Sequence, residues 1–166
     1  MRGMLVAVAV TLAALPAAAD DPPDVEFQPV PCTVPGQPIS LCAGVSDDLE
    51  VAKARIYFRA TGDEYFSHVD MTFGGIDYCG TLPAPREGKL KSLEYYVQAV
   101  DSGYQTKRTS TFQMLVQPEG VCGFPPLQKD PQKAGSIVVH ATHKKQGGKL
   151  PKQFDPAGVT FVPFGQ

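Results

Sequence analysis

The sequence has no tryptophan, only three histidines and no marked excess of either charge. Its 15 basic and 17 acidic residues give a net charge of −2, so there is no electrostatic reason to expect nucleic acid or an anionic membrane surface as a partner. No segment after residue 19 carries apolar residues at helical spacing. These absences exclude a nucleic-acid-binding protein of the strongly basic kind and a mainly helical fold.

The longest apolar run lies at the N-terminus and is too short to span a bilayer. It covers residues 4–15, follows the basic residue Arg2, and ends at Pro16 before three alanines. A basic start, a short apolar run and small residues are the three parts of a secretory signal peptide. We therefore expect residues 1–19 to be a signal peptide cleaved after Ala19, and the mature chain to be periplasmic or secreted.

Four cysteines remain in the expected mature chain: Cys32, Cys42, Cys79 and Cys122. An even number in an exported protein indicates two disulfides, because an oxidising compartment forms and keeps them. A zinc site is not indicated, since no two of these cysteines have the C-x-x-C spacing. Oxidised cysteines are also unable to act as thiolate nucleophiles.

Residues 32–122 read as a series of short strands. Turn-forming residues recur about every ten positions, for example VPGQP at 34–38, TGDE at 61–64 and DSG at 101–103, which is typical of an all-β sandwich. Between the turns, apolar and polar residues alternate, so that one set faces the core. The expected inward-facing residues are Ile39, Leu41, Ala43, Val45, Ala54, Ile56, Phe58, Val69, Met71, Ile76, Tyr78, Leu82, Leu93, Tyr95, Val97, Ala99, Phe112, Met114 and Val116.

The flanking segments have a different character. Residues 20–31 are proline-rich and predict an extended lead-in or an edge strand interrupted by proline. Residues 123–135 predict a linker, and residues 136–166 a C-terminal β-hairpin or tail whose strands are 136–142 and 157–164. A lone hairpin is marginally stable in water, so we expect it to dock on its own domain or to pair with another chain.

Four stretches of the body carry a resemblance to a known family. They are GQPISLCAGVSDD at 36–48, AKARIYFRATG at 52–62, DYCGTLPAP at 77–85 and SLEYYVQAVDSG at 92–103. Together they resemble strands B, C, E and F of the immunoglobulin-like and fibronectin type III-like domains of bacterial exported proteins. The resemblance implies an immunoglobulin-like antiparallel β-sandwich with an added C-terminal β-hairpin. The chain departs from the antibody branch, since it has no tryptophan and no cysteine on the expected F strand. Unrelated functions share this sandwich, so the resemblance assigns no activity.

That strand order implies a disulfide pairing. Strands B and E are neighbours in one sheet of such sandwiches, and Cys42 and Cys79 both fall on the face away from the core. Cys32 comes just before the turn into strand B and Cys122 just after the last strand, so both are expected near the same pole. The resemblance therefore implies the pairs Cys42–Cys79 and Cys32–Cys122.

The histidines are the first candidates for chemistry. His140 and His143 lie three positions apart on an expected strand and could converge on a metal only if a turn begins between them; Lys144 and Lys145 would oppose a cation. The sequence has neither a G-x-S-x-G nucleophile motif nor a phosphate-binding glycine loop. We therefore predict no catalytic residues, no metal and no cofactor. A small secreted enzyme or metal-binding protein that uses these histidines and His68 remains the alternative hypothesis.

A group of aspartates and a basic segment suggest other ligands. Asp47, Asp48 and Asp101 could bind Ca²⁺, whose preferred ligands are carboxylate and carbonyl oxygens of loops. The simpler explanation, which the sequence favours, is that aspartate stabilises turns through its own backbone hydrogen bonds. The basic segment 144–152 could bind an acidic polysaccharide, or it is a solvated loop.

Aromatic residues give the clearest sign of an interaction surface. Tyr57, Tyr65, Phe66 and Tyr96 fall on outward or edge positions of the expected strands, and aromatic residues are enriched in recognition surfaces. Side by side on strands C and F, Tyr57 and Tyr96 would form a patch for a sugar, a peptide or the protein's own tail. We therefore predict a non-catalytic binding or adaptor protein, with a protein or a cell-surface polysaccharide as its partner. The resemblance to domains of bacterial exported proteins implies that it belongs to a bacterial cell envelope. An assembly subunit that adds a C-terminal strand to a partner's sheet is a further hypothesis.

Overall fold

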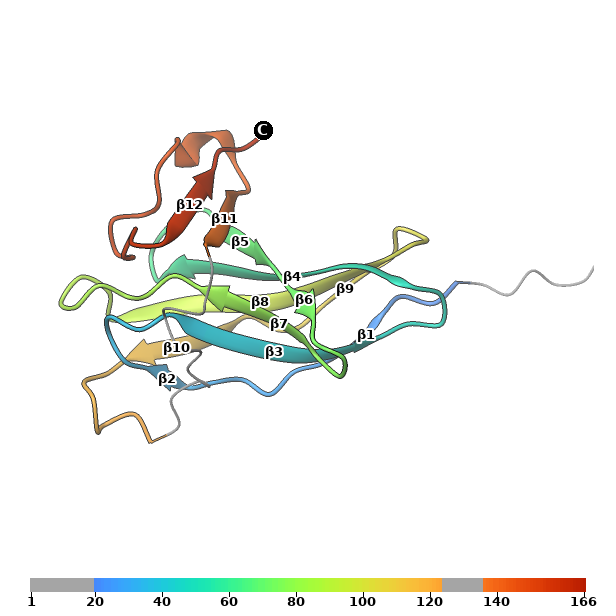
Figure 1. Cartoon of the computed structure of the whole chain (residues 1–166), viewed down its shortest axis with the longest axis horizontal. Coiled ribbons are helices and arrows are strands. Elements are labelled where there is room, and N and C mark those ends of the chain that lie inside the picture. Colours follow the sequence, from blue (N-terminus) through green and yellow to red (C-terminus); the bar gives the residue numbers. More distant parts are fainter. Residues whose placement is uncertain (1–19, 124–135) are drawn as a thin grey trace, which may run out of the picture.

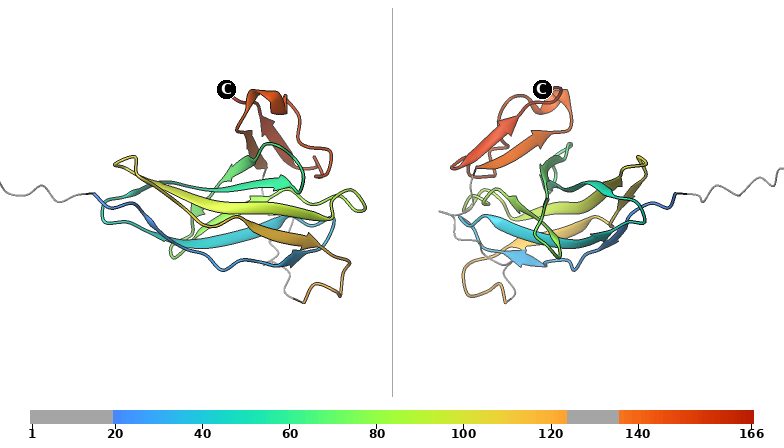
Figure 2. Two further views of the ribbon diagram at one scale, coloured as in Figure 1. Left: turned by 180° about the vertical axis from the view of Figure 1, so that it is seen from behind. Right: turned by 45° about the vertical axis from the view of Figure 1, so that its right-hand side comes forward.

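The computed structural model describes residues 20–123 and 136–166, and these residues form two β-sheets packed face to face (Figure 1). The expected signal peptide and all but the first residue of the expected linker lie outside the described residues. Figure 2 shows the same two layers from behind and after a turn of 45°, with the C-terminal segment standing above them. Within the described residues, no helix is long and apolar enough to cross a membrane.

The two sheets have the strand order of an immunoglobulin-like sandwich. The smaller sheet contains, in spatial order, β1 (Asp24–Glu26), β3 (Ile39–Ser46), β7 (Tyr78–Leu82) and β6 (Thr72–Phe73). The larger sheet contains β12 (Val159–Val162), β11 (Ile137–Ala141), β5 (Ser67–Asp70), β4 (Val51–Ala60), β8 (Ser92–Asp101), β10 (Phe112–Val116) and β2 (Cys32–Thr33), and β9 (Thr106–Arg108) also pairs with β8. Strands β1, β3, β7 and β6 take the places of A, B, E and D, while β4, β8 and β10 take those of C, F and G. The all-β sandwich predicted from the sequence is confirmed.

The antiparallel pair β4 and β8 forms the centre of the larger sheet, and its inner face builds the core. Ile56 lies opposite Val97, and Phe58 lies opposite Tyr95, and all four side chains are buried. The Tyr95 hydroxyl accepts a hydrogen bond from the backbone N–H of Val30 at 2.8 Å and donates one to its carbonyl at 3.1 Å. Burial raises the pKa of Tyr95 to about 12. This buried hydroxyl therefore holds the N-terminal segment against the sandwich.

One residue predicted to face the core is exposed. Ile76 is 86% exposed, because it belongs to the turn between β6 and β7 and not to β7 itself, which begins at Tyr78. The backbone N–H of Gly74 donates to the carbonyl of Asp77 and closes this turn. The alternation of a strand does not extend into a turn, so the inward assignment of Ile76 was wrong.

Two disulfides fasten the body, and their pairs are those implied by the strand order. Cys42 on β3 lies directly opposite Cys79 on β7, and the bond joins the two strands of the smaller sheet. Cys32 on β2 is bonded to Cys122, which follows β10, and both pack against Val34.

The C-terminal segment extends the larger sheet, but it is not a hairpin. Strand β11 pairs with β5, and β12 pairs with β11 in parallel. A parallel pair needs a connection of about a dozen residues or more, and residues 142–158 supply it. This connection contains the short helix η1 (Lys144–Gln146) and Phe154, which is buried in the core with its ring edge against Phe58. From the sequence, this segment is expected either to dock on its own domain or to pair with another chain. The structure shows it docked on its own domain.

Candidate functional site

A row of four rings crosses the outer face of the larger sheet, and we call it the ring row. Tyr96 on β8 lies opposite Tyr57 on β4, which lies opposite His68 on β5, which lies opposite His140 on β11. Successive ring centroids are 4.8, 5.2 and 4.9 Å apart. The row therefore joins strands that are far apart in the sequence.

The ring row follows from strand periodicity. Ile56 and Phe58 face the core, so Tyr57 between them faces outward, and the register of β4 with β8 sets Tyr96 beside it. The two tyrosines therefore lie side by side, as the predicted surface patch requires. Binding of a ligand by that patch stays a prediction. Sequence reasoning missed His68 and His140 as members of the row, because only the position of β11 beside β5 brings them together.

The four rings of the row form two stacked pairs. Tyr57 and Tyr96 are 6° from parallel, and His68 and His140 are 12° from parallel. The guanidinium of Arg108 lies 5.0 Å from the centroid of the Tyr96 ring and covers it on another side. Within each pair, one face of each ring is therefore occupied by its partner, and Arg108 lies over the Tyr96 ring as well, which leaves less ring face for the stacking of a sugar.

Tyr96 is more deeply placed than the sequence predicted. It lies on the outward face of β8, but only 9% of it is exposed. Phe66 sets its ring against Tyr96 at 5.1 Å and 67°, and Arg59 in turn lies 4.3 Å over the Phe66 ring. Neighbouring side chains therefore cover Tyr96, and Tyr57 and Phe66 are the more accessible members of the patch.

Tyr65 belongs to a second, smaller contact next to the ring row. Its ring stacks on His143 with centroids 4.3 Å apart, and its hydroxyl donates to the Glu64 carboxylate at 2.6 Å. That hydrogen bond raises the pKa of Tyr65. Of the four aromatic residues predicted as a surface, Tyr96 thus contacts both Tyr57 and Phe66, whereas Tyr65 packs on His143 of the C-terminal segment.

Two ion pairs flank the ring row. Arg55 and Asp70 are 2.8 Å apart, and Arg59 and Glu94 are 2.6 Å apart. Burial raises the pKa of Asp70 and the Arg55 guanidinium lowers it; the guanidinium prevails, and the pKa lies below its usual value. Burial, and then the Arg55 charge, lowers the pKa of His68 to about 4. His68 is therefore uncharged at neutral pH.

The histidines proposed as metal ligands have separate partners. His140 stacks on His68, while His143 stacks on Tyr65 and accepts a hydrogen bond from the backbone N–H of Lys145. His140 and His143 therefore do not form a metal-binding pair. Across residues 20–123 and 136–166, three or more potential metal ligands converge at one place, which involves aspartates and not histidines.

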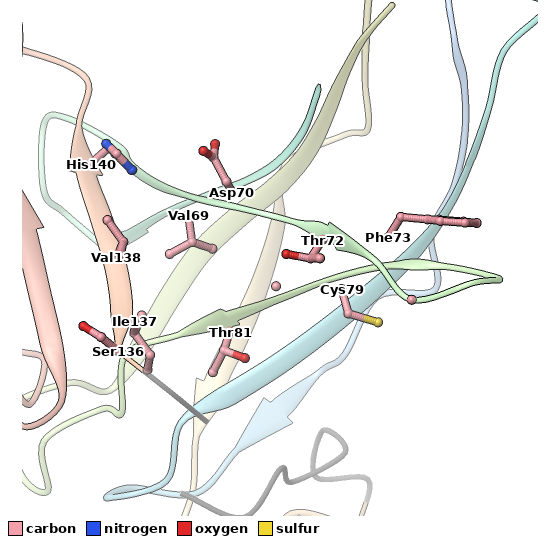
Figure 3. Close-up of a pocket in the computed structure, with 12 residues that line it drawn as sticks. Val69, Asp70, Thr72, Phe73, Cys79, Thr81, Ser136, Ile137, Val138 and His140 are labelled. Carbon is pink, nitrogen blue, oxygen red and sulfur yellow. The ribbon is translucent and has the colours of Figure 1, made fainter. Parts of the chain in front are cut away.

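A groove of about 550 Å³ lies at the end of the ring row (Figure 3). His140 lines it, and so do Asp70 and Thr72 from the β5–β6 region, Thr81 from β7 and Val138 from β11. Strand β11 pairs with β5 only at its last two residues, so its first part borders the groove. Strand β6, the last strand of the smaller sheet, borders the other side. No local sequence signal predicts this groove, because it arises where two sheets diverge.

Comparison with known proteins adds little about function. No known family and no curated protein matches the chain. Among solved structures, an engineered protein is similar over 61% of this chain and 21% of its own, with 15% identity and a TM-score of 0.44. A mutant of the SrpA adhesin from Streptococcus sanguinis is similar over 59% of this chain and 58% of its own, with 14% identity and a TM-score of 0.39. The chain thus spans less than two thirds of either protein, and similarities this weak carry no inference about activity.

Proposed function

We propose that this protein is a non-catalytic binding or adaptor protein of a bacterial cell envelope, and that it holds an extended segment of a partner protein in the groove. The observation that carries the proposal is the position of the groove between two strand borders, β6 and β11, with the ring row ending in it at His140. An extended peptide bound beside a strand gains main-chain hydrogen bonds, and its alternate side chains enter pockets.

The lining of the groove suits such a peptide. Val69, Phe73 and Ile137 offer apolar contacts, while Asp70 and His140 offer hydrogen-bonding groups. The partner's side chains, which alternate in direction along an extended strand, would meet both kinds of surface. Tyr57 and Phe66, the more accessible rings of the patch, would then contact whatever part of the partner extends beyond the groove.

Two further features support the compartment and the absence of catalysis. The expected signal peptide and the two disulfides favour an oxidising compartment outside the cytoplasm. Within the described part of the chain, every cysteine is in a disulfide, so a thiolate mechanism has no nucleophile there. His68 is uncharged and enclosed between Tyr57 and His140, which leaves it poorly placed to exchange protons with a substrate.

Affinity capture from envelope extracts tests the proposal. Val138 lines the groove and is 41% exposed, whereas Leu115 lies on β10, outside the groove, and is 45% exposed. We expect the mature wild-type chain and Leu115→Arg to recover the same partner, and Val138→Arg to lose it. Equal recovery by Val138→Arg would contradict binding in the groove. If the extract instead yields an acidic polysaccharide, and its recovery requires the lysines of residues 144–152, then the partner is a glycan and not a protein.

A second function is favoured by the edge position of β12. This strand ends the larger sheet, so a partner's strand could continue the sheet there and make the protein an assembly subunit. Thr160 is exposed on β12, and Thr111 is exposed before β10. A lysine on an edge strand opposes further pairing, so Thr160→Lys should block such an assembly while Thr111→Lys preserves it. Truncation of residues 136–166 is unsuitable, because it removes core residues such as Val139 and Phe154.

A further inference from the structure

Three aspartates from separate segments meet at one end of the sandwich, away from the ring row. Asp20 precedes β1, Asp47 lies in the connection from β3 to β4, and Asp101 is the last residue of β8. Figure 1 shows these three segments at the same end of the sandwich. One carboxylate oxygen from each residue lies within 4.8 Å of the other two. We call these residues the aspartate cluster.

Each residue of the aspartate cluster has a buried oxygen that lacks a hydrogen bond. Asp101 is only 1% exposed; its Oδ1 accepts from the backbone N–H of Gln105 at 2.8 Å, and its Oδ2 has no partner. Asp47 repeats the arrangement, since its Oδ1 accepts from the N–H of Leu49 and its Oδ2 has none. Oδ1 of Asp20 is likewise without a partner. In the described residues, three of the five buried side-chain atoms of this kind belong to the cluster.

Unpartnered buried oxygens are costly, and three carboxylates this close also repel one another. Across the described residues, the salt bridges join Arg55 or His68 to Asp70, and Arg59 to Glu94, so none reaches the cluster. The cluster therefore has three unpartnered acceptor oxygens, and no salt bridge of the described residues brings a cation to them.

We propose that the aspartate cluster binds one Ca²⁺ ion. Oxygens that share a Ca²⁺ at ~2.4 Å can be at most about 4.8 Å apart, and the cluster meets this condition. Ca²⁺ accepts six to eight oxygen ligands in flexible geometry, so water and backbone carbonyls of the surrounding turns would complete the set around three carboxylates. The buried Asp101 supplies a fixed ligand from the sandwich, while the half-buried Asp20 and Asp47 keep the site open to solvent.

Bound Ca²⁺ would join the start of the body to two turns at this end. It would connect Asp20 to the β3–β4 connection and to the turn after β8, where the side-chain amide of Gln105 donates to the Asp20 carbonyl. The site is independent of the groove, so the inference stands whether or not the groove binds a peptide. Extracellular Ca²⁺ modules have dissociation constants of about 10⁻⁴–10⁻³ M, and we expect a value in this range.

Two measurements on the mature chain test the proposal. Titration calorimetry with Ca²⁺ alone gives the affinity and the number of ions bound, and thermal unfolding in EDTA and in Ca²⁺ gives the shift in melting temperature. We expect one Ca²⁺ per chain and a higher melting temperature with Ca²⁺. Asp101→Asn and Asp47→Asn should each weaken Ca²⁺ binding at least tenfold and remove the Ca²⁺-dependent rise in melting temperature. In EDTA, each variant should melt at or above the wild-type temperature, because one of the mutually repelling carboxylates is gone. Two variants are used so that the result survives if one of them fails to fold.

Asp48→Asn is the matched control, because it removes an exposed negative charge at the same end without removing a cluster oxygen. It should retain the Ca²⁺-dependent shift. A competing cation is the α-ammonium group that cleavage after Ala19 would create on Asp20. If that group neutralises the cluster, Ca²⁺ will leave the melting temperature of the mature chain unchanged, and the proposal is overturned. Equal losses in Asp48→Asn and Asp47→Asn would also overturn it, since they would indicate a diffuse acidic surface.

Discussion

Tyr57 on β4 and Tyr96 on β8 lie directly opposite each other, and their rings stack 6° from parallel with centroids 4.8 Å apart. The pair sits on the outer face of the same two strands whose inner face holds Ile56 and Val97 in the core. Side chains on both faces therefore stabilise the central strand pair. A loss of binding in a tyrosine variant must consequently be separated from a loss of stability.

A double-mutant cycle measures the contribution of this pair to stability. Aromatic pairs are worth about 0.5–1.5 kcal/mol beyond the area they bury, so we expect a coupling free energy in that range between Tyr57→Ala and Tyr96→Ala in urea denaturation. The control cycle combines Tyr57→Ala with Tyr104→Ala, since Tyr104 is 88% exposed in the turn after β8. Those two changes should be additive within about 0.5 kcal/mol. Additivity in both cycles would show that the observed stack is energetically neutral.

His68 predicts a loss of stability in mild acid. Its pKa is about 4 in the folded protein and about 6.5 in an unfolded chain, so the unfolded state takes up the proton first. The contribution of the neutral imidazole to the free energy of unfolding is therefore fully present above pH 6.5 and is lost as the pH falls toward 4. At 1.36 kcal/mol per pKa unit, the difference between the two pKa values corresponds to a loss of up to about 3 kcal/mol. The charged or titratable groups around it are Arg55, Lys53, Asp70 and His140.

The variant His68→Phe isolates this effect. Phenylalanine keeps a ring between Tyr57 and His140 but cannot be protonated. The free energy of unfolding, measured by denaturant titration at several pH values, should fall less in the variant than in the wild type between pH 6.5 and 4. Parallel curves for the two proteins would assign the acid sensitivity to other groups.

Local patterns were sufficient for most of the sandwich. The alternation of Leu93, Tyr95 and Val97 predicted the inner face of β8, and the expected strand order implied the pairing of Cys42 with Cys79. Both follow from short-range periodicity together with one topological assumption. The same reasoning failed at Ile76, because strand β7 begins two residues later than the pattern suggested and Ile76 lies in the turn before it.

The features that the sequence could not predict depend on which strands and residues, far apart in the sequence, become neighbours in the fold. Alternation in β12 is the same for a parallel and an antiparallel neighbour, so the direction of its pairing with β11 was not readable. The contact of His140 with His68 depends on which sheet edge β11 joins. The sequence offers Asp47, Asp48 and Asp101 as possible Ca²⁺ ligands but favours a role in turns. The structure places Asp20, and not Asp48, beside Asp47 and Asp101, because the lead-in strand β1 runs beside β3.

Removal of either disulfide should weaken the fold strongly. The cysteines are 90 positions apart in Cys32–Cys122 and 37 apart in Cys42–Cys79, and the chain-entropy model gives about 4.6 and about 3.9 kcal/mol for loops of these sizes. We expect each alanine double variant to lose about 4 kcal/mol of unfolding free energy, measured by guanidinium titration. Wild-type protein with both bonds reduced is the comparison and should be less stable than either variant.

Phe154 should hold the C-terminal segment on the sandwich. It is 1% exposed and packs against Phe58, whereas Phe164 near the C-terminus is 57% exposed. Phe154→Ala should cost about 3–5 kcal/mol and should speed hydrogen exchange in β11 and β12 more than in β8. Phe164→Ala is the control and should change neither. An equal increase in exchange across all strands would mean that the segment and the sandwich unfold as one unit.

Gly80 occupies an inward position of β7 at which the core has no space for a side chain. A Cβ there would lie 2.8 Å from Cδ1 of Ile56 and 3.3 Å from Cγ of Met71. Overpacking of a filled core typically costs 1–3 kcal/mol, so Gly80→Ala should lower the unfolding free energy by about that amount. Gly123→Ala is the control, since a Cβ at that position meets no atom of the described residues within 4 Å.

A second substitution shows whether crowding is the cause. Ile56→Val removes the Cδ1 atom that the new methyl group would contact, and alone it should cost about 0.5–1.5 kcal/mol. In the double variant, the alanine methyl group fills part of the space that the valine leaves, so the combined loss should be smaller than the sum of the two single losses. A double variant whose loss equals that sum would show that Gly80 is required for its backbone rather than for its lack of a side chain.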